Sequence, residues 1–277
     1  MNYDYAVHSD FLIHWTGRDI DSKYDQQWYQ SDKSKTNKNC DISNLYLKRL
    51  LDILKYGLWM TTEENEPPLC FNGVSIDIPS TPKTCFTELK LSESRKHARQ
   101  YGRLGIGVKR PFVFDRFGRP VVYYGFHSNL ENDHFLQNVT QKITDKSLLN
   151  FFKPMNSSKV LNYDFYAESE WRILFFQELL NQELIIDPRD ERNIKHHEYF
   201  QRLPVDDQKK LKYLIPLNGW FAIIIYPSLD VKNKAQQGQS NKIQQEIQRI
   251  KSVQDRGNKI EGGNLPIEVD LDACRNF

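Results

Sequence analysis

The sequence predicts an α+β fold in which a mixed central sheet is flanked by helices. Residues 220–226 form an unbroken apolar run, which is typical of a strand covered on both faces. Leucines recur at helical spacing between Leu47 and Leu54, which predicts an amphipathic helix. Strand-like and helical segments follow one another in irregular order without an internal repeat, so the pattern favours a mixed sheet.

Short runs rich in β-branched and aromatic residues predict the strands. They cover residues 11–17, 58–61, 84–88, 106–109, 120–124, 166–176, 220–226 and 265–271. The first run places Leu12 and His14 on one face and closes in a turn at Gly17, because side chains alternate along a strand. The run at 220–226 is the strongest, and we expect it to be central or well covered.

Apolar residues at spacings of three and four predict the helices. They cover residues 44–56, 92–101, 130–152, 195–199 and 236–255. Ser43 and Ser92 are the expected N-caps of the first two, and Gly57 and Gly102 are their expected C-terminal stops. The last helix carries isoleucines on one stripe, as a surface helix does.

Polar and Gly/Pro-rich stretches separate these elements. Residues 19–39 predict a surface loop or lid, and residues 63–82 predict a connection that includes a small hairpin. We expect residues 1–232 to form a single α+β domain that carries the functional site. Residues 233–277 would then add a peripheral C-terminal helix and strand.

Composition limits the classes of partner. Thirty-eight basic and 36 acidic residues leave a net charge of +2, so the global charge indicates neither a nucleic-acid nor a membrane binder. The four cysteines form no C-x-x-C pair, and His196 and His197 would point about 100° apart on a helix, so we expect no metal. The N-terminus lacks a leader pattern and the longest apolar run is too short to span a bilayer, so we expect a cytoplasmic protein.

A charged row opens the strand predicted at 166–176. Alternation places Glu168, Glu170 and Arg172 on one face and Trp171 on the other. Buried carboxylates without partners are costly, so such a row needs either solvent or a ligand. The working hypothesis is a ligand, and the alternative is a Glu170–Arg172 salt bridge on a solvated strand edge.

Five short motifs follow one another along the chain: His14-Trp15-Thr16-Gly17, Leu50-Leu51-x-Ile53-Leu54-x-x-Gly57-Leu58, Cys85-Phe86-Thr87-Glu88, Tyr101-Gly102-x-x-Gly105-Ile106-Gly107 and Glu168-x-Glu170-Trp171-Arg172. In this order they resemble the AbiGi-type abortive phage-infection proteins, over residues 11–226. The resemblance implies a role in phage defence. It also implies an antitoxin, which would neutralise a toxin or sense its state.

A weaker resemblance concerns mechanism. A strand ending in His-x-Thr, the following Leu-x-x-Ile-Leu-x-x-Gly helix and the Glu-x-Glu element resemble ADP-ribosyltransferase-fold proteins of the DarT type. This resemblance implies an ADP-ribosyltransferase-like fold, NAD as substrate and Glu170 as the catalytic carboxylate. The cofactor-binding residues would be His14, Thr16, Phe86, Thr87, Tyr101 and Arg172. The chain departs from the pattern in lacking a clear Ser-Thr-Ser element.

The residue types suit this chemistry. Cleavage of the bond to nicotinamide passes through an oxocarbenium-like ribose, which a fixed carboxylate such as Glu170 stabilises. Glu168 would orient the acceptor or take its proton, and Arg172 would pair with Glu170 or reach a phosphate. The glycines from Gly102 to Gly107 lie between a helix and a strand, the wrong order for a dinucleotide fingerprint, so a Rossmann site is not expected.

Three functions remain open at this point. The first is an ADP-ribosyltransferase or NAD glycohydrolase, with NAD or a related nucleotide as partner and a protein or nucleic acid as acceptor. The second is a non-catalytic antitoxin or sensing partner of a toxin encoded nearby. The third is an RNA nuclease that uses His14 and His97, which ranks last because no lysine constellation supports it.

Overall fold

The computed structural model describes residues 11–26, 28–29, 41–62, 68–71, 74–88, 90–124, 134–154, 168–237, 242–253 and 266–276. The chain divides into two compact units that alternate along the sequence. Unit 1 comprises Met1–Leu58, Phe86–Val113 and Ile215–Phe277, and unit 2 comprises Trp59–Cys85 and Phe114–Leu214. The predicted boundary at residue 232 stays a prediction.

The sheet of unit 1 is built around β1 (Phe11–Thr16) and β12 (Phe221–Tyr226). β6 (Leu104–Lys109) lies between them and is antiparallel to both. β13 (Ile267–Asp270) pairs with β12 in parallel. All six residues of β12 are buried between these neighbours, which confirms the prediction that the apolar run is well covered.

Glycines let β6 lie close to its neighbours. A Cβ atom added at Gly107 would lie 2.0 Å from Cγ2 of Ile223 on β12, and one at Gly105 would lie 3.1 Å from Ile13 Cγ2 and Ile225 Cβ. Bulky side chains of β1 and β12 therefore occupy the space above these glycines. The sequence needs Gly at position 107 for steric reasons.

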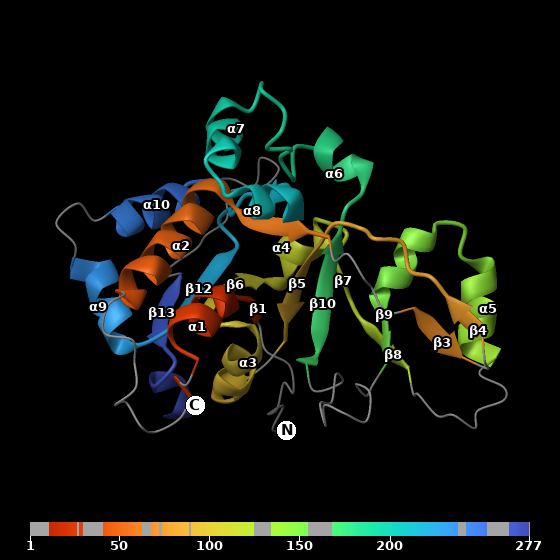
Figure 1. Cartoon of the computed structure of the whole chain (residues 1–277), viewed down its shortest axis with the longest axis horizontal. Helices are drawn as coiled ribbons and strands as arrows, with labels where there is room; N and C mark the ends of the chain where they lie inside the picture. Colours follow the sequence, from red (N-terminus) through yellow and green to blue (C-terminus); the bar gives the residue numbers. More distant parts are fainter. Residues whose placement is uncertain are drawn as a thin grey trace, which may run out of the picture. The chain divides into compact units, whose positions relative to one another are not determined.

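Three helices of unit 1 pack together: α2 (Ile42–Tyr56), α9 (Leu229–Gln237) and α10 (Lys242–Lys251) (Figure 1). The isoleucine stripe of α10 is buried, so this helix contributes to the core. The N-cap of α2 is Asp41, whose side chain accepts from the backbone N–H of Asn44, so the prediction of Ser43 was wrong. Gly57 ends the helix as predicted.

α3 (Ser94–Tyr101) packs against β1. Its Ala98 belongs to a core cluster with Ile13 and Trp15 of β1, and Tyr101 packs against this cluster. Ser92 lies inside a 3-10 turn (Leu91–Glu93) that precedes α3, so it is not the N-cap that we predicted. Gly102 follows the last helical residue, as expected.

α1 (Arg18–Tyr24) corrects the prediction of a loop that begins at residue 19. Only Ile20 and Asp21 of this polar helix are buried, so its sequence shows no apolar stripe. The carboxylate of Asp21 accepts from Tyr46 Oη at 2.6 Å and from Arg103 Nε at 2.8 Å. Hydrogen bonds from Tyr46 and Arg103, which are distant in the sequence, therefore stabilise α1. Residues 27 and 30–39 of the predicted loop lie outside the described residues.

β10 (Glu170–Leu174) belongs to a group of strands whose residues lie mostly in unit 2. β7 (Arg119–Pro120) pairs with β10 antiparallel, and β5 (Lys83–Thr87) pairs with it as well. β5 also pairs with β2 (Leu58–Thr61), whose other neighbour is β11 (Leu211–Ile215). β10 is thus an interior strand, and all five of its residues are buried.

A smaller part of unit 2 contains the predicted hairpin, which β3 (Leu69–Phe71) and β4 (Val74–Ile76) confirm. β8 (Val122–Tyr124) and β9 (Phe152–Pro154) pair in parallel. Within the described residues, the helix predicted at 130–152 is divided into α5 (His134–Lys142) and a 3-10 helix (Lys146–Phe151). Leu69, Tyr124 and Leu149 form the core of this part.

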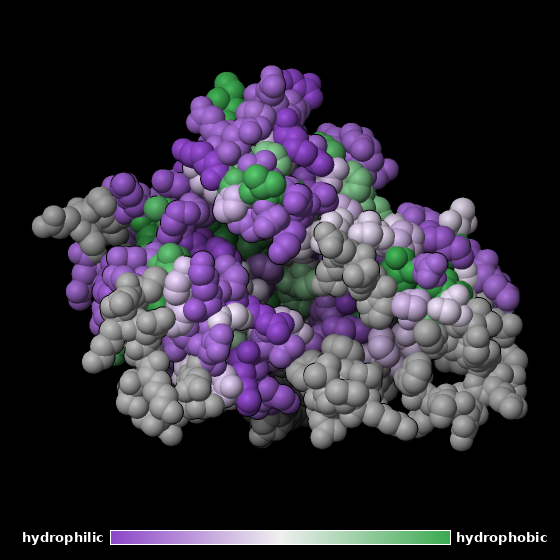
Figure 2. Space-filling model, in the orientation of Figure 1, coloured by the Kyte–Doolittle hydropathy of each residue, from purple (hydrophilic) through white to green (hydrophobic). Residues whose placement is uncertain are grey.

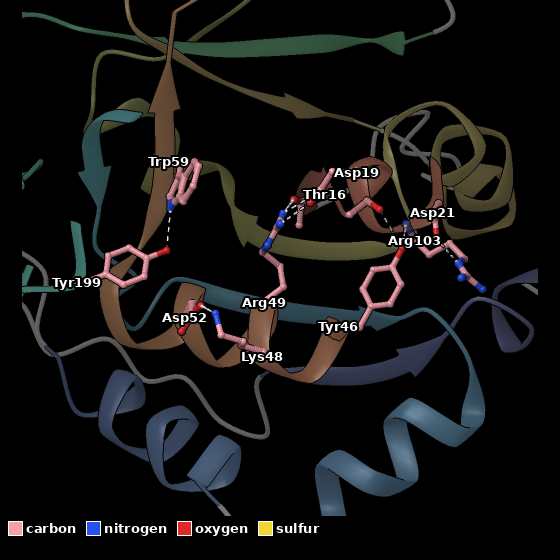
Figure 3. A network of polar contacts seen from close by, with 11 residues as sticks. Thr16, Asp19, Asp21, Tyr46, Lys48, Arg49, Asp52, Trp59, Arg103 and Tyr199 are labelled. Atoms are coloured by element: carbon pink, nitrogen blue, oxygen red, sulfur yellow. Dashed lines mark hydrogen bonds and ion pairs between the residues drawn. The ribbon is translucent and has the colours of Figure 1, made fainter. Parts of the chain in front are cut away.

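Further helices complete the chain: α4 (Arg110–Phe114), α6 (Gln177–Asn181), α7 (Ile194–Gln201) and α8 (Val205–Lys210). Tyr199 of α7 accepts a hydrogen bond from Trp59 Nε1 of β2 at 3.2 Å (Figure 3). Figure 2 shows mostly hydrophilic residues, with some hydrophobic ones among them, over α6, α7 and α8. The protein is therefore α+β, with a mixed sheet and flanking helices as predicted; the likeness to the ADP-ribosyltransferase fold stays a prediction.

Candidate functional site: a buried charged cluster in unit 2

The Glu-x-Glu element lies at the start of β10. The strand begins at Glu170, so Glu168 precedes it, and the described part of the predicted strand is shorter than expected. Ser169 has a φ of 45°, in the left-handed region that non-glycine residues seldom adopt. This turn interrupts the alternation immediately before the strand. Tyr166 and Ala167 lie outside the described residues.

Glu170 is the centre of what we call the charged cluster, which consists of Lys153, Glu168, Glu170 and Arg172. Its Oε1 accepts from Arg172 Nε at 2.7 Å, and its Oε2 accepts from Arg172 Nη2 at 3.1 Å. Oε2 also accepts from Lys153 Nζ at 2.9 Å. Both carboxylate oxygens are thus held by cations of the chain.

Lys153 joins the two glutamates. It lies on β9, and its Nζ donates to Glu168 Oε2 at 2.6 Å as well as to Glu170. Sequence reasoning missed this residue, because a single lysine between Phe152 and Pro154 belongs to no recognisable pattern. It supplies the second positive charge, so the four side chains balance to zero.

Uncharged groups make further hydrogen bonds to residues of the charged cluster. The backbone N–H of Glu170 donates to Tyr123 Oη at 2.8 Å, and Arg172 Nη1 donates to the backbone oxygen of Asn150. Asn150 is itself fixed, since its Nδ2 donates to the oxygens of Pro79 and Thr81 at 3.0 and 3.2 Å. The arginine is therefore held at both ends of its planar group.

The electrostatics follow from burial and pairing. Glu168, Glu170 and Arg172 are only 2%, 6% and 6% exposed. Burial alone would raise the pKa of Glu170, but Arg172 and Lys153 outweigh it and hold this pKa well below its usual range. Burial raises the pKa of the neighbouring Cys85 thiol, and the Glu170 charge raises it further. The carboxylate stays ionised at neutral pH while the thiol stays protonated.

The charged row is therefore satisfied within the chain. We expected solvent or a ligand to account for it, with a Glu170–Arg172 salt bridge on a solvated edge as the alternative. The Glu170–Arg172 pair is present, but it lies on an interior strand and is buried. The two carboxylates can be buried here because Lys153 supplies the second positive charge that balances them.

The other predicted site residues belong to unit 1. The rings of His14 and Phe86 meet edge to face with centroids 5.9 Å apart. Thr16 alternates onto the same face of β1 as His14, and its Oγ1 accepts from Arg49 Nη1 at 3.0 Å (Figure 3). The structure thus brings His14, Thr16 and Phe86 to one face of the sheet.

Thr87 and Tyr101 lie on the opposite face. Thr87 is the register partner of Ile13, whose side chain belongs to the core cluster that Tyr101 packs against. The rings of Tyr101 and His97 lie 5.9 Å apart, which confirms that these residues share one face of α3. The roles proposed for the unit 1 residues in binding NAD stay predictions.

Comparison with known proteins identifies the family of the chain. A family model described as "Putative abortive phage resistance protein AbiGi, antitoxin" matches residues 60–214, more than half of the sequence. The chain belongs to the AbiGi family. The match spans nearly all of unit 2, including the charged cluster, and the α3–β6 part of unit 1. No curated protein and no solved structure matches this AbiGi chain.

Two further features concern ligands and membranes. Among the described residues, no three His, Cys, Asp or Glu side chains are grouped so that they could hold a metal ion. In the same part of the chain, each helix is too short or too polar to cross a bilayer.

Proposed function

We propose that this AbiGi protein is the non-catalytic, neutralising partner of a toxin in an abortive phage-resistance system. One observation carries the proposal, namely that both oxygens of Glu170 are held by cations of the chain, the buried Arg172 and the partly buried Lys153. The description of the family as an antitoxin agrees with it. A buried network of this kind fixes the structure of unit 2, and such a network needs no substrate.

The contrast with a catalytic carboxylate is geometric. To stabilise an oxocarbenium-like ribose, a carboxylate must turn a lone pair toward the sugar and accept from its 2′-hydroxyl. Glu170 accepts three charged hydrogen bonds, and the thiol of Cys85 adds a fourth. A substrate would have to displace at least one of these partners from a site that is 6% exposed.

Expression of the protein in a bacterial host tests the proposal. Alone, it should leave growth unchanged, and together with the toxin encoded beside it, it should restore the growth that the toxin arrests. A variant that cannot fold, such as one with Leu214→Asp in the core, is the matched control and should not restore growth. Growth arrest by the protein alone would contradict the proposal.

A second candidate is glycosyl transfer from NAD, by an ADP-ribosyltransferase or an NAD glycohydrolase. The contact of His14 with Phe86, with Thr16 on the same face, favours it. The bond between ribose and nicotinamide would break, and its electron pair would leave with nicotinamide. Water or an acceptor hydroxyl or amine would then attack the ribose and give its proton to Glu168, while Glu170 stabilises the cation.

Nicotinamide release separates the two candidates. Purified protein is incubated with NAD, alone and with protein and nucleic-acid acceptors, and free nicotinamide is measured. The transferase predicts release that Glu170→Gln abolishes in protein that circular dichroism shows to be folded. The neutralising partner predicts no release above a blank without protein.

A further inference from the structure

A second surface, on unit 1, has a different character from the charged cluster. Four cations are exposed on two neighbouring helices: Arg18 and Lys23 on α1, and Lys96 and Arg99 on α3. With Trp28 and Tyr29 they form what we call the α1–α3 surface. The two helices touch, because a Cβ added at Gly102, directly after α3, would lie 2.2 Å from the backbone nitrogen of Arg18.

The three carboxylates of α1 and its C-cap, Asp19, Asp21 and Asp25, are engaged by arginines of the same unit. Arg103 donates to Asp21 at 2.8 Å and to Asp25 at 2.7 Å. Asp19 pairs with Arg49 at 2.8 Å (Figure 3). These acids are therefore neutralised locally, so the exposed cations give the α1–α3 surface a positive potential. Figure 2 shows hydrophilic residues over these helices.

Three arginines at intervals of four residues stack on the adjacent aromatic pair. The guanidinium carbons of Arg95 and Arg103 lie 5.6 and 5.2 Å from the ring centroid of Trp28. That of Arg99 lies 4.2 Å from the ring centroid of Tyr29. Trp28 and Tyr29 meet edge to face at 6.0 Å, and Tyr29 is 40% exposed. An aromatic ring is thereby fixed on the surface among cations.

We propose that the α1–α3 surface binds single-stranded nucleic acid. Cations bind the phosphates, and exposed aromatic rings stack with unpaired bases regardless of sequence. Tyr29 supplies the ring, and Arg99 supplies the cation on it. Lys96 lies three residues before Arg99 and so on the same side of α3. An acidic peptide would use the cations but would offer no base to stack on the exposed part of the Tyr29 ring. The proposal goes beyond neutralisation of a toxin, since it involves neither the charged cluster nor unit 2.

Fluorescence anisotropy with labelled strands of about 12 nucleotides, one RNA and one DNA, tests the proposal. The double variant Lys96→Ala/Arg99→Ala should bind at least tenfold more weakly. It should also reduce the slope of log affinity against log salt by about 0.7 for each lost phosphate contact. Tyr29→Ala should weaken binding by about tenfold with little change in that slope.

The matched control is Lys209→Ala/Lys210→Ala on α8, which removes the same charge from exposed positions of unit 2. It should change the affinity by less than about twofold. Stronger binding of the RNA or of the DNA tells which strand the surface prefers, and either result supports the proposal. Absence of binding at low salt, an equal loss in the control, or full affinity in Tyr29→Ala would overturn it.

Discussion

Glu170→Gln tests whether the charged cluster stabilises the fold. The substitution keeps the shape of the side chain and removes its charge. It also replaces one acceptor oxygen by an NH2 group, which can only donate. Glu170 accepts three hydrogen bonds from cations, at 2.7, 2.9 and 3.1 Å. Oε2 accepts two of these bonds and Oε1 accepts one, so glutamine loses one or two of them, depending on which position its oxygen takes. Each lost bond is worth about 1.5–3 kcal/mol. Breaking a buried ion pair from one side costs about 3–5 kcal/mol in other proteins, which agrees.

The free energy of unfolding at pH 7 should therefore fall by about 3–5 kcal/mol, and the melting temperature by roughly 10 °C. Urea denaturation followed by tryptophan fluorescence measures the first, and calorimetry measures the second. Glu191→Gln, at an exposed position of unit 2, is the control and should change the free energy by less than about 0.5 kcal/mol.

The dependence on pH gives an independent check. The pKa of Glu170 in the folded protein is held below its ordinary value of 4.5, so the unfolded chain binds the proton more tightly. The stability that Glu170 contributes is present above pH 4.5 and is lost as the pH falls below it. Wild type should lose more stability than Glu170→Gln over this acid range. If Glu170→Gln is as stable as wild type at pH 7 and loses the same stability at acid pH, the charged cluster does not stabilise the fold.

Three further predictions concern stability, each measured by urea denaturation against wild type. Gly107→Ala should lower the free energy of unfolding by about 1–3 kcal/mol, because the new Cβ would lie 2.0 Å from a side-chain carbon of β12. Tyr46→Phe should lower it by about 1–3 kcal/mol, because buried Asp21 loses a donor at 2.6 Å. Arg172→Lys should lower it although the charge is kept, because lysine cannot bind Glu170 through two donors and also reach the Asn150 oxygen. A free energy of unfolding equal to that of wild type would contradict the steric argument for Gly107→Ala. The same result would contradict the hydrogen-bonding argument for Tyr46→Phe and the bidentate argument for Arg172→Lys.

Much of the fold follows from local patterns. The apolar run of β12, the hairpin of β3 and β4 and the isoleucine stripe of α10 each encode their element in a few adjacent residues. α1 does not, since its seven residues bury only Ile20 and Asp21. Its stability depends on Tyr46 and Arg103, which are 25 and 82 positions away from Asp21. Sequence patterns cannot reveal such contacts.

The charged cluster was predicted only in part, for the same reason. The period of a strand places Glu170 and Arg172 side by side, and the structure confirms this. Lys153 and Tyr123, 17 and 47 positions before Glu170, reach it only through the pairing of β8 with β9. Without them the sequence shows two acids and one cation, an imbalance that favours a ligand. With Lys153 included, the imbalance disappears.

The motif Glu-x-Glu-Trp-Arg can therefore be explained by folding alone. Glu170 and Arg172 form a bidentate pair on one face of β10, and Trp171 on the other face packs edge to face on Phe114, with ring centroids 5.3 Å apart. Each residue of the motif in the strand thus has a structural partner in unit 2. A shared motif of this kind indicates a shared local structure, and it implies a shared reaction only where one of its polar atoms still faces a substrate. In this chain the two oxygens of Glu170 face Arg172 and Lys153, so the motif has a structural explanation in the contacts of unit 2.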